Sequence, residues 1–353
     1  MIRANAGAAE TDLAVQRRRV VLSGVVGTTL EWFDFLLYGL IAPAAFDRLF
    51  FPDWSAGAAN VVVLSIYAAG YAARPLGALV FGHFGDRIGR KPMLYISLAM
   101  MGGATALMGV LPPYGTVGPV AGFLLLTLRA LQGFALGGEV TGAVILASEN
   151  GPAGRRGAFT SLVQIGGALG TVAASLAATL VAHLPDEAFL SWGWRLPFLS
   201  SAVLVLLGLY VRRHVAESPV FTAAMSARAP EPVPVAALLR RELRPTVVIC
   251  LVQITQSSML AIFTVFALVY GIGQGHVARA DLLDGILIGN ALGAVAMPAF
   301  GQLSDRLGRR PLIIFSLTLA VIYAALVLFP LLGTARAMVV TLVMAIPPAV
   351  IQP

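Results

Sequence analysis

Long apolar stretches dominate the chain, and short gaps between them carry most of its charge. Hydrophobic residues make up 58% of its 353 residues and charged residues only 12%, against about 25% charged residues in a soluble domain. Inside a membrane the backbone must satisfy its own hydrogen bonds, and a helix of about 20 apolar residues does so. We therefore predict an all-α integral membrane protein with ten spanning helices, at residues 20–45, 58–81, 93–111, 118–148, 158–183, 191–211, 245–270, 282–300, 312–332 and 337–353.

One of the gaps occurs twice in the sequence. Residues 82–92, GHFGDRIGRKP, return as residues 301–311, GQLSDRLGRRP, with six of eleven positions identical. The offset of 219 residues is the size of one half of a membrane protein built from two repeats. We predict four parts: a cytoplasmic tail at 1–19, a six-helix bundle at 20–211, a cytoplasmic loop at 212–244 and a second bundle at 245–353.

The second bundle is shorter than the first. Adding the offset of 219 to the end of the sixth span, residue 211, places the end of a matching half near residue 430, well beyond Pro353. We therefore expect four spans in the second bundle, two fewer than in the first. The sequence is interpreted as a fragment or a truncated gene product.

Basic residues gather in alternate gaps. Eighteen of the 24 lie in the tail, the two repeated turns, the gap after the fourth span and the central loop. The gaps on the other side hold only Arg48, Arg195, Arg279 and Arg336. Lys and Arg accumulate on the cytoplasmic side of membrane proteins. We therefore predict a bacterial inner-membrane protein whose N-terminus and repeated turns are cytoplasmic.

The motifs of common enzyme and cofactor sites are missing from the sequence. It has no Walker loop, no dinucleotide-binding glycine fingerprint, no HExxH and no nucleophile elbow. Cys250 is the one cysteine, and the four histidines are scattered, which argues against a disulfide framework or a metal site. The net charge of +7 comes from short gaps and not from a basic domain. We predict no enzyme activity, no cofactor, no metal and no nucleic-acid partner.

Acidic residues inside a predicted span are the sharpest functional signal. An acid at mid-membrane costs at least about 2.5 kcal/mol on insertion scales, so it must pair or line water. Glu31, Asp34 and Tyr38 are spaced by three and four residues and therefore share one helix face. We predict that Asp34 carries a proton, with Glu31 or Glu139 as further carriers. The alternative is a permanent salt bridge to a neighbouring helix.

Arg129, in the fourth span, has three possible roles. It would hold a substrate carboxylate through two parallel hydrogen bonds, keep Asp34 ionised, or tie two spans together. Arg74, near the cytoplasmic end of the second span, is expected to be a structural or gating partner. Polar residues in the fifth and seventh spans either line the substrate cavity or join helices by hydrogen bonds. The predicted substrate-binding residues are Arg129, Tyr38, Gln164, Gln253 and Gln256.

Glycines in two spans are spaced to bring helices together. Gly133 and Gly137 lie in the fourth span, and Gly166, Gly167 and Gly170 lie in the fifth. Small residues at such spacings let helix backbones approach closely in lipid. We predict close packing at these positions, without a chemical role.

Several motifs together resemble the major facilitator superfamily. They are the doubled G-x-x-x-D-R-x-G-R-[KR]-P turn, EWFDFLLYG in the first span, LRALQGFALGGE in the fourth, and WGWRLPF before the sixth. Within the superfamily they are most similar to the metabolite:proton symporters, which include shikimate, 2-oxoglutarate, citrate and proline/betaine permeases. The resemblance covers residues 20–330. The sequence departs from many relatives after Glu139, where it reads VTGA in place of Trp-Gly-Gly-Ala.

The resemblance implies transport by alternating access, in which two six-helix bundles rock about a central site. It also implies that the repeated turns gate the cytoplasmic side, where Asp86 and Asp305 bond nearby arginines and a helix N-terminus. The residues assigned to gating are Asp86, Arg87, Arg90, Asp305, Arg306, Arg309 and Arg74.

The sequence as a whole predicts a monomeric, proton-coupled symporter in the lipid bilayer. Its expected substrate is a small carboxylate or zwitterionic metabolite, with shikimate-like acids and dicarboxylates favoured. Three alternatives stay open: a facilitator or exchanger without proton coupling, a membrane sensor that binds a metabolite without moving it, and an inactive fragment.

Overall fold

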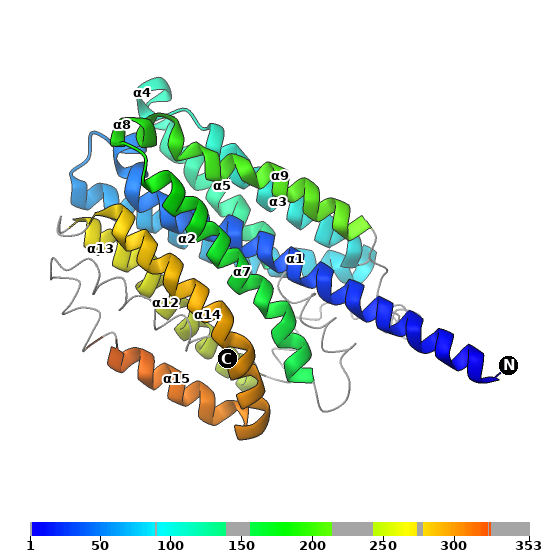
Figure 1. The fold of residues 1–353 in the computed structure, drawn as a ribbon. Helices are drawn as coiled ribbons and strands as arrows, with labels where there is room; N and C mark the ends of the chain where they lie inside the picture. The colour runs from blue at the N-terminus through cyan, green and yellow to red at the C-terminus, as the bar shows by residue number, and fades with distance from the viewer. Residues whose placement is uncertain are drawn as a thin grey trace.

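The computed structural model describes residues 2–88, 90–138, 156–213, 243–273, 278–323 and 325. Within these ranges the secondary structure is helical and contains no strand. Neighbouring helices run side by side along one common direction, with the first half in blue to green and the second in yellow and orange (Figure 1). This is the all-α membrane fold expected from the apolar stretches, because each helix satisfies its own backbone hydrogen bonds.

The described residues of the first half contain six long helices, and a short π-helical turn precedes the last of them. Their bounds are α1 Ile2–Phe50, α2 Ala56–Ile88, α3 Arg90–Val110, α4 Tyr114–Val117, α5 Val120–Gly137, α7 Arg156–Ala182, α8 Asp186–Ala188, η1 Phe189–Gly193 and α9 Arg195–Arg213. Six stretches of this half are long and apolar enough to cross a membrane: Leu22–Phe50, Gly57–Gly85, Pro92–Val110, Val120–Gly137, Ile165–Ala182 and Asp186–Tyr210. Six predicted spans of the first bundle therefore have helices in the structure.

The second half contributes the helices α12 Leu243–Ala261, η2 Ile262–Phe266, α13 Ala267–Gly273, α14 Arg279–Leu307 and α15 Arg309–Tyr323. They cover the seventh and eighth predicted spans and the first part of the ninth, whose last residues lie outside the described part of the chain. The tenth lies outside the described residues, and so does most of the predicted cytoplasmic loop. The count of ten spans therefore stays a prediction.

Two boundaries differ from the sequence-based expectation. The apolar part of α1 begins at Leu22, close to the predicted start at residue 20, but the helix itself extends back to Ile2. The expected tail is thus a continuation of the first helix. In the fourth span, α5 ends at Gly137, and residues 139–155 lie outside the described part of the chain.

The two repeated turns lie at the same end of the molecule. Arg195, at the start of α9, donates hydrogen bonds to Gly109 and Leu111 at the end of α3. Arg279, at the start of α14, donates to Ala182 at the end of α7. Since α9 follows α7 after a short connection, all four helix termini share one end. One turn precedes α3 and the other follows α14, so both lie at the opposite end, as the charge pattern predicts.

Glycines bring two helix pairs into backbone contact, as predicted. A Cβ atom at Gly133 of α5 would lie 1.8 Å from the carbonyl oxygen of Gly70 of α2. A Cβ atom at Gly170 of α7 would lie 2.3 Å from the carbonyl oxygen of Thr29 of α1. Both distances are far below van der Waals contact, so only glycine fits at these crossings. The contacts hold α2 against α5 and α1 against α7.

The second half packs on the face of the first half formed by α1 and α7. Helix α14 lies along α7, and α13 and η2 contact α1. A hydrogen bond of 3.0 Å from Asn290 Nδ2 to Ser175 Oγ crosses this seam between buried side chains. The seam between α7 and α14 is therefore where the two halves meet.

Candidate functional site: a buried arginine in an aromatic cage

Arg129 of α5 is the centre of the candidate site, and its side chain is 0% exposed. Its Nη1 donates a hydrogen bond of 3.1 Å to the backbone oxygen of Phe35 in α1. Its Nε and Nη2 have no hydrogen-bond partner among the described residues. A buried donor left unsatisfied costs about 1–3 kcal/mol, and more when it is charged. These two nitrogens therefore mark a position that suits an anionic group.

Three aromatic rings surround the guanidinium group. Its Cζ lies 4.0 Å from the ring centroid of Phe35, 4.7 Å from that of Tyr38 and 4.8 Å from that of Tyr67. The faces of aromatic rings attract cations, by about 2 kcal/mol or more where water is excluded. We call these four residues the arginine cage. It brings together Arg129 and Tyr38, two of the residues predicted to bind substrate.

The space for the arginine is made by a glycine on the facing helix. A Cβ atom at Gly70 of α2 would lie 2.7 Å from Nε of Arg129 and 3.2 Å from its Cζ. Any larger residue at this position would displace the guanidinium. Gly70 also forms the backbone contact with Gly133, so one crossing of α2 and α5 both packs the bundle and places the cation.

A second cation shares one ring of the cage. The Cζ of Arg74 lies 4.0 Å from the centroid of Phe35 and 4.4 Å from that of Tyr71. Phe35 therefore contacts two guanidinium groups, each at 4.0 Å from its centroid. The carboxylate of Glu31 interacts electrostatically with Arg74. Arg74, expected to be a structural or gating partner, thus lies beside the arginine cage.

Gln132 connects the arginine to the backbone of α1 at Asp34 and to α3. Its side-chain oxygen accepts a hydrogen bond from Nη1 of Arg129. Its Nε2 donates to the backbone oxygen of Asp34 at 2.8 Å and to Oγ1 of Thr105 at 2.7 Å. One buried amide therefore fixes the position of Arg129 against α1 and α3. The sequence held a signal for it, because an amide three residues after a buried arginine shares its helix face.

The two acids of α1 that were predicted to carry protons are both buried. Asp34 is 1% exposed and Glu31 is 5% exposed. A Cβ atom at Gly102 of α3 would lie 3.2 Å from Oδ2 of Asp34, so this carboxylate faces α3. Tyr38, on the same helix, donates its hydroxyl hydrogen to the backbone oxygen of Val63 in α2 at 3.4 Å. Asp34 and Tyr38, predicted to share one helix face, therefore contact two different neighbouring helices, α3 and α2.

The structure does not place the remaining predicted site residues. Glu139 lies outside the described residues. For the others the helix backbone is described but the side chain is not, and they are Gln164, Gln253, Gln256, Asp86, Arg87, Arg90, Asp305, Arg306 and Arg309. Their assigned roles stay predictions. Phe35, Tyr67, Gly70 and Gln132 were missed by sequence reasoning. Aromatic and small residues in a span resemble ordinary packing positions, whereas Gln132 carried the signal given above.

Comparison with known proteins places the chain in one family. Residues 24–350 match the family described as Major Facilitator Superfamily. The chain is 38% identical over 329 residues to the inner membrane metabolite transport protein YhjE of Escherichia coli, covering 92% of this chain and 75% of that protein. It is 41% identical over 306 residues to the shikimate transporter of Escherichia coli, covering 85% of this chain and 70% of that protein.

The solved structures agree on the fold. A crystal structure of a D-xylose-proton symporter matches with a TM-score of 0.70 at 18% identity, covering 95% of this chain and 80% of that one. At such low identity the likeness concerns the fold alone. Together with the two-part helical architecture and the family match over residues 24–350, it shows that the chain belongs to the major facilitator superfamily and is a multi-pass membrane transporter.

Proposed function

We propose that this chain couples the entry of protons to the uptake of a small carboxylate-bearing metabolite by alternating access between its two halves. The observation that carries the proposal is the buried Arg129, whose Nε and Nη2 are unsatisfied by described residues. A guanidinium group offers parallel N–H donors that match the two oxygens of a carboxylate. The relative named as a shikimate transporter moves an acid of this kind, which favours the same class here.

The arginine cage suits a ring-shaped or zwitterionic acid. The cation would bind the carboxylate, while the aromatic side chains of Tyr38 and Tyr67 beside it would contact the rest of the molecule. Gln164 of α7 and the two glutamines of α12, Gln253 and Gln256, would complete the site from the facing helices. Relatives named as shikimate and proline/betaine transporters support a substrate that is compact and carries a carboxylate.

The proton would travel on Asp34, with Glu31 or Glu139 as further carriers. A carboxylate held inside the membrane binds or releases a proton as its surroundings change between desolvated and wet. Proton entry down a membrane potential of about 100 mV supplies about 2.3 kcal/mol per charge, and this drives accumulation of the metabolite.

The repeated turns would form the cytoplasmic gate. Asp86 and Asp305, with Arg87, Arg90, Arg306 and Arg309, would bond across the two halves when that side is closed. An acid beside a helix N-terminus is favoured by about 0.3–1 kcal/mol, which biases two states without locking either of them. The gate and the site then open in turn, and one monomer suffices for the cycle.

A reconstituted uptake assay tests the proposal. The purified chain is placed in lipid vesicles, and uptake of labelled shikimate, a dicarboxylate and a betaine is followed with and without an imposed pH gradient. We expect the gradient to drive at least one acid above its equilibrium distribution. Uptake that only equilibrates would instead assign a facilitator or exchanger, and binding without uptake of any acid would assign a sensor.

Replacing Asp34 with asparagine should separate accumulation from exchange. Asp34→Asn keeps the size of the side chain but replaces the carboxyl group by an amide, which neither binds nor releases a proton. We therefore expect uphill uptake to be lost while exchange across the membrane continues. The measurement is gradient-driven accumulation against counterflow in the same vesicles. Asp47→Asn, at the far end of the same helix, is the control and should accumulate substrate like the parent. Full accumulation by Asp34→Asn would remove Asp34 from the mechanism.

A further inference from the structure

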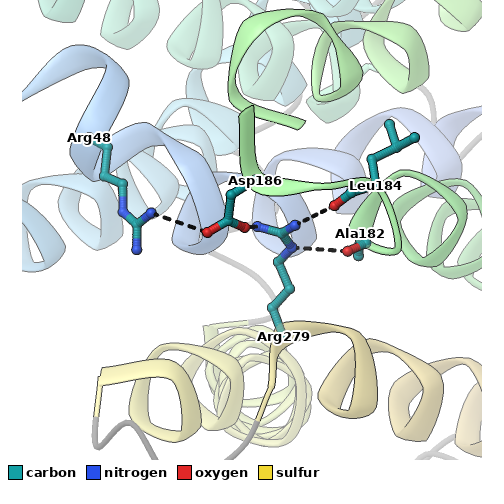
Figure 2. A network of polar contacts seen from close by, with 5 residues as sticks. All are labelled: Arg48, Ala182, Leu184, Asp186 and Arg279. Carbon is teal, nitrogen blue, oxygen red and sulfur yellow. Dashed lines mark hydrogen bonds and ion pairs between the residues drawn. The ribbon is translucent and has the colours of Figure 1, made fainter. Parts of the chain in front are cut away.

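A cluster of polar contacts joins the two halves at the end opposite the repeated turns (Figure 2). Arg279, at the start of α14, donates from Nε to Ala182 O at 3.1 Å and from Nη2 to Leu184 O at 3.0 Å. Its Nη1 donates to Oδ1 of Asp186 at 2.8 Å. Its Cζ also lies 4.0 Å from the ring centroid of Phe189. We call these five residues the outer clasp.

The hydrogen bonds from Arg279 to the carbonyls at the end of α7 stabilise the clasp more than its ion pair with Asp186 does. The last carbonyls of a helix have no partner within it and carry partial negative charge, so a cation there is stabilising. The side chain of Arg279 is only 16% exposed, whereas that of Asp186 is 70% exposed. Exposed ion pairs contribute about 0–1 kcal/mol. The same carboxylate lies 4.0 Å from Nη1 of Arg48, which keeps it beside the cluster.

The same device occurs within the first half, where it joins helices of one bundle. Arg195, at the start of α9, donates from Nη1 to Gly109 O at 2.9 Å and to Leu111 O at 2.8 Å. Its Cζ lies 4.5 Å from the ring of Trp194. Both arginines therefore cap a helix C-terminus beside an aromatic ring. They differ in that Arg195 has its partners in its own half, whereas Arg279 reaches across to the other.

A second contact crosses the seam near the clasp. His183 Nε2 lies 3.5 Å from Oδ1 of Asp284, one turn further along α14. Here too the residues come from opposite halves, and the side chains are 57% and 38% exposed. Among the described residues, these two contacts between the halves both lie at this end of the seam, where a rocking motion would separate the helices most.

We propose that the outer clasp holds the two halves closed at this end and must release in every transport cycle. The inference rests on the proposed alternating access. Hydrogen bonds of 2.8–3.1 Å cannot persist when the ends of α7 and α14 move apart. Their combined strength therefore sets how often this end opens. Removing Arg279 shifts the population toward the state that is open at this end.

A buried reporter cysteine measures the opening. Ala178 of α7 is 1% exposed and lies three residues beyond Ser175, on the face that meets α14. Ala178→Cys is introduced after Cys250, which is exposed, has been changed to serine. The protein is placed in lipid nanodiscs, and the rate of labelling by a water-soluble maleimide is measured. Arg279→Ala should raise the rate about tenfold, whereas Arg195→Ala should change it less than about twofold.

Two results would overturn the clasp. One is an unchanged labelling rate in Arg279→Ala, and the other is an equal rise in Arg195→Ala, which would indicate general loosening. If Arg279→Ala does not fold, Asp186→Ala replaces it, because this exposed side chain is not needed for packing. It should raise the rate about threefold, and a rise no larger than that of Arg195→Ala would again overturn the clasp. Labelling needs neither substrate nor protons, so failure of the clasp is distinguishable from failure of the transport assay.

Discussion

Arg129→Lys is expected to lower the initial rate of uptake about 100-fold while the protein still folds. Lysine keeps the positive charge but presents one point of donation where arginine presents a planar fork. One of the two hydrogen bonds between charged groups is lost, and such a bond is worth about 1.5–3 kcal/mol. A loss of about 3 kcal/mol corresponds to a factor of about 100. The rate is measured in lipid vesicles with the acid that the parent accumulates best.

The matched control is Arg244→Lys near the start of α12, where the residue is exposed. It makes the same chemical change outside the arginine cage and should keep at least half of the parent's rate. If Arg129 only ties helices together, Arg129→Lys would lower thermal stability, but the folded fraction would bind substrate with the parent's KM. A rate above half of the parent's in Arg129→Lys contradicts the proposed site outright.

Gly133→Ala is expected to prevent stable folding. The new methyl group would lie 1.8 Å from Gly70 O and 2.6 Å from its carbonyl carbon. Both are backbone atoms, so no side-chain rotation relieves the clash, and α2 and α5 must separate. Overpacking of this kind costs about 3 kcal/mol or more. The separation would also displace the side chain of Arg129, because its Nε packs directly against Gly70.

Gly103→Ala in α3 is the control for that change. A Cβ atom at Gly103 has nothing within 4 Å, and alanine favours the helix over glycine by about 1 kcal/mol. We expect the folded yield and the Tm of Gly103→Ala in detergent to equal or exceed those of the parent. Equal yields for the two variants would show that the α2–α5 crossing tolerates a side chain.

Much of the fold follows from hydropathy, because an apolar stretch of sufficient length in a membrane has few options other than a helix. The six apolar helices of the first half appear where the sequence predicts them. Hydropathy reports where the hydrocarbon begins and not where a helix ends, so the extension of α1 back to Ile2 was not predicted. Alanine, glutamate, glutamine and arginine in that segment favour a helix even in water.

The site was only partly predictable for a related reason. Arg129 and Tyr38 stand out because polar groups are costly in a span, but their contact is between helices, and no local pattern encodes it. Phe35 and Gly70 carry no cost in lipid, so nothing in the sequence separates them from packing residues. Arg279 belonged to the few basic residues outside the cytoplasmic gaps, yet two of its three hydrogen-bond partners are backbone carbonyls, which every sequence has.

The glycine crossings also constrain how the protein moves. At Gly133 and Gly170 backbone contacts backbone, so no change of side-chain rotamer can accommodate a displacement of one helix against the other. The pairs α2–α5 and α1–α7 are therefore expected to be rigid. At the seam the halves touch through side chains such as Ser175 and Asn290, which can exchange partners. We therefore expect movement between the two halves to occur at this seam, while the pairs α2–α5 and α1–α7 each move as a unit.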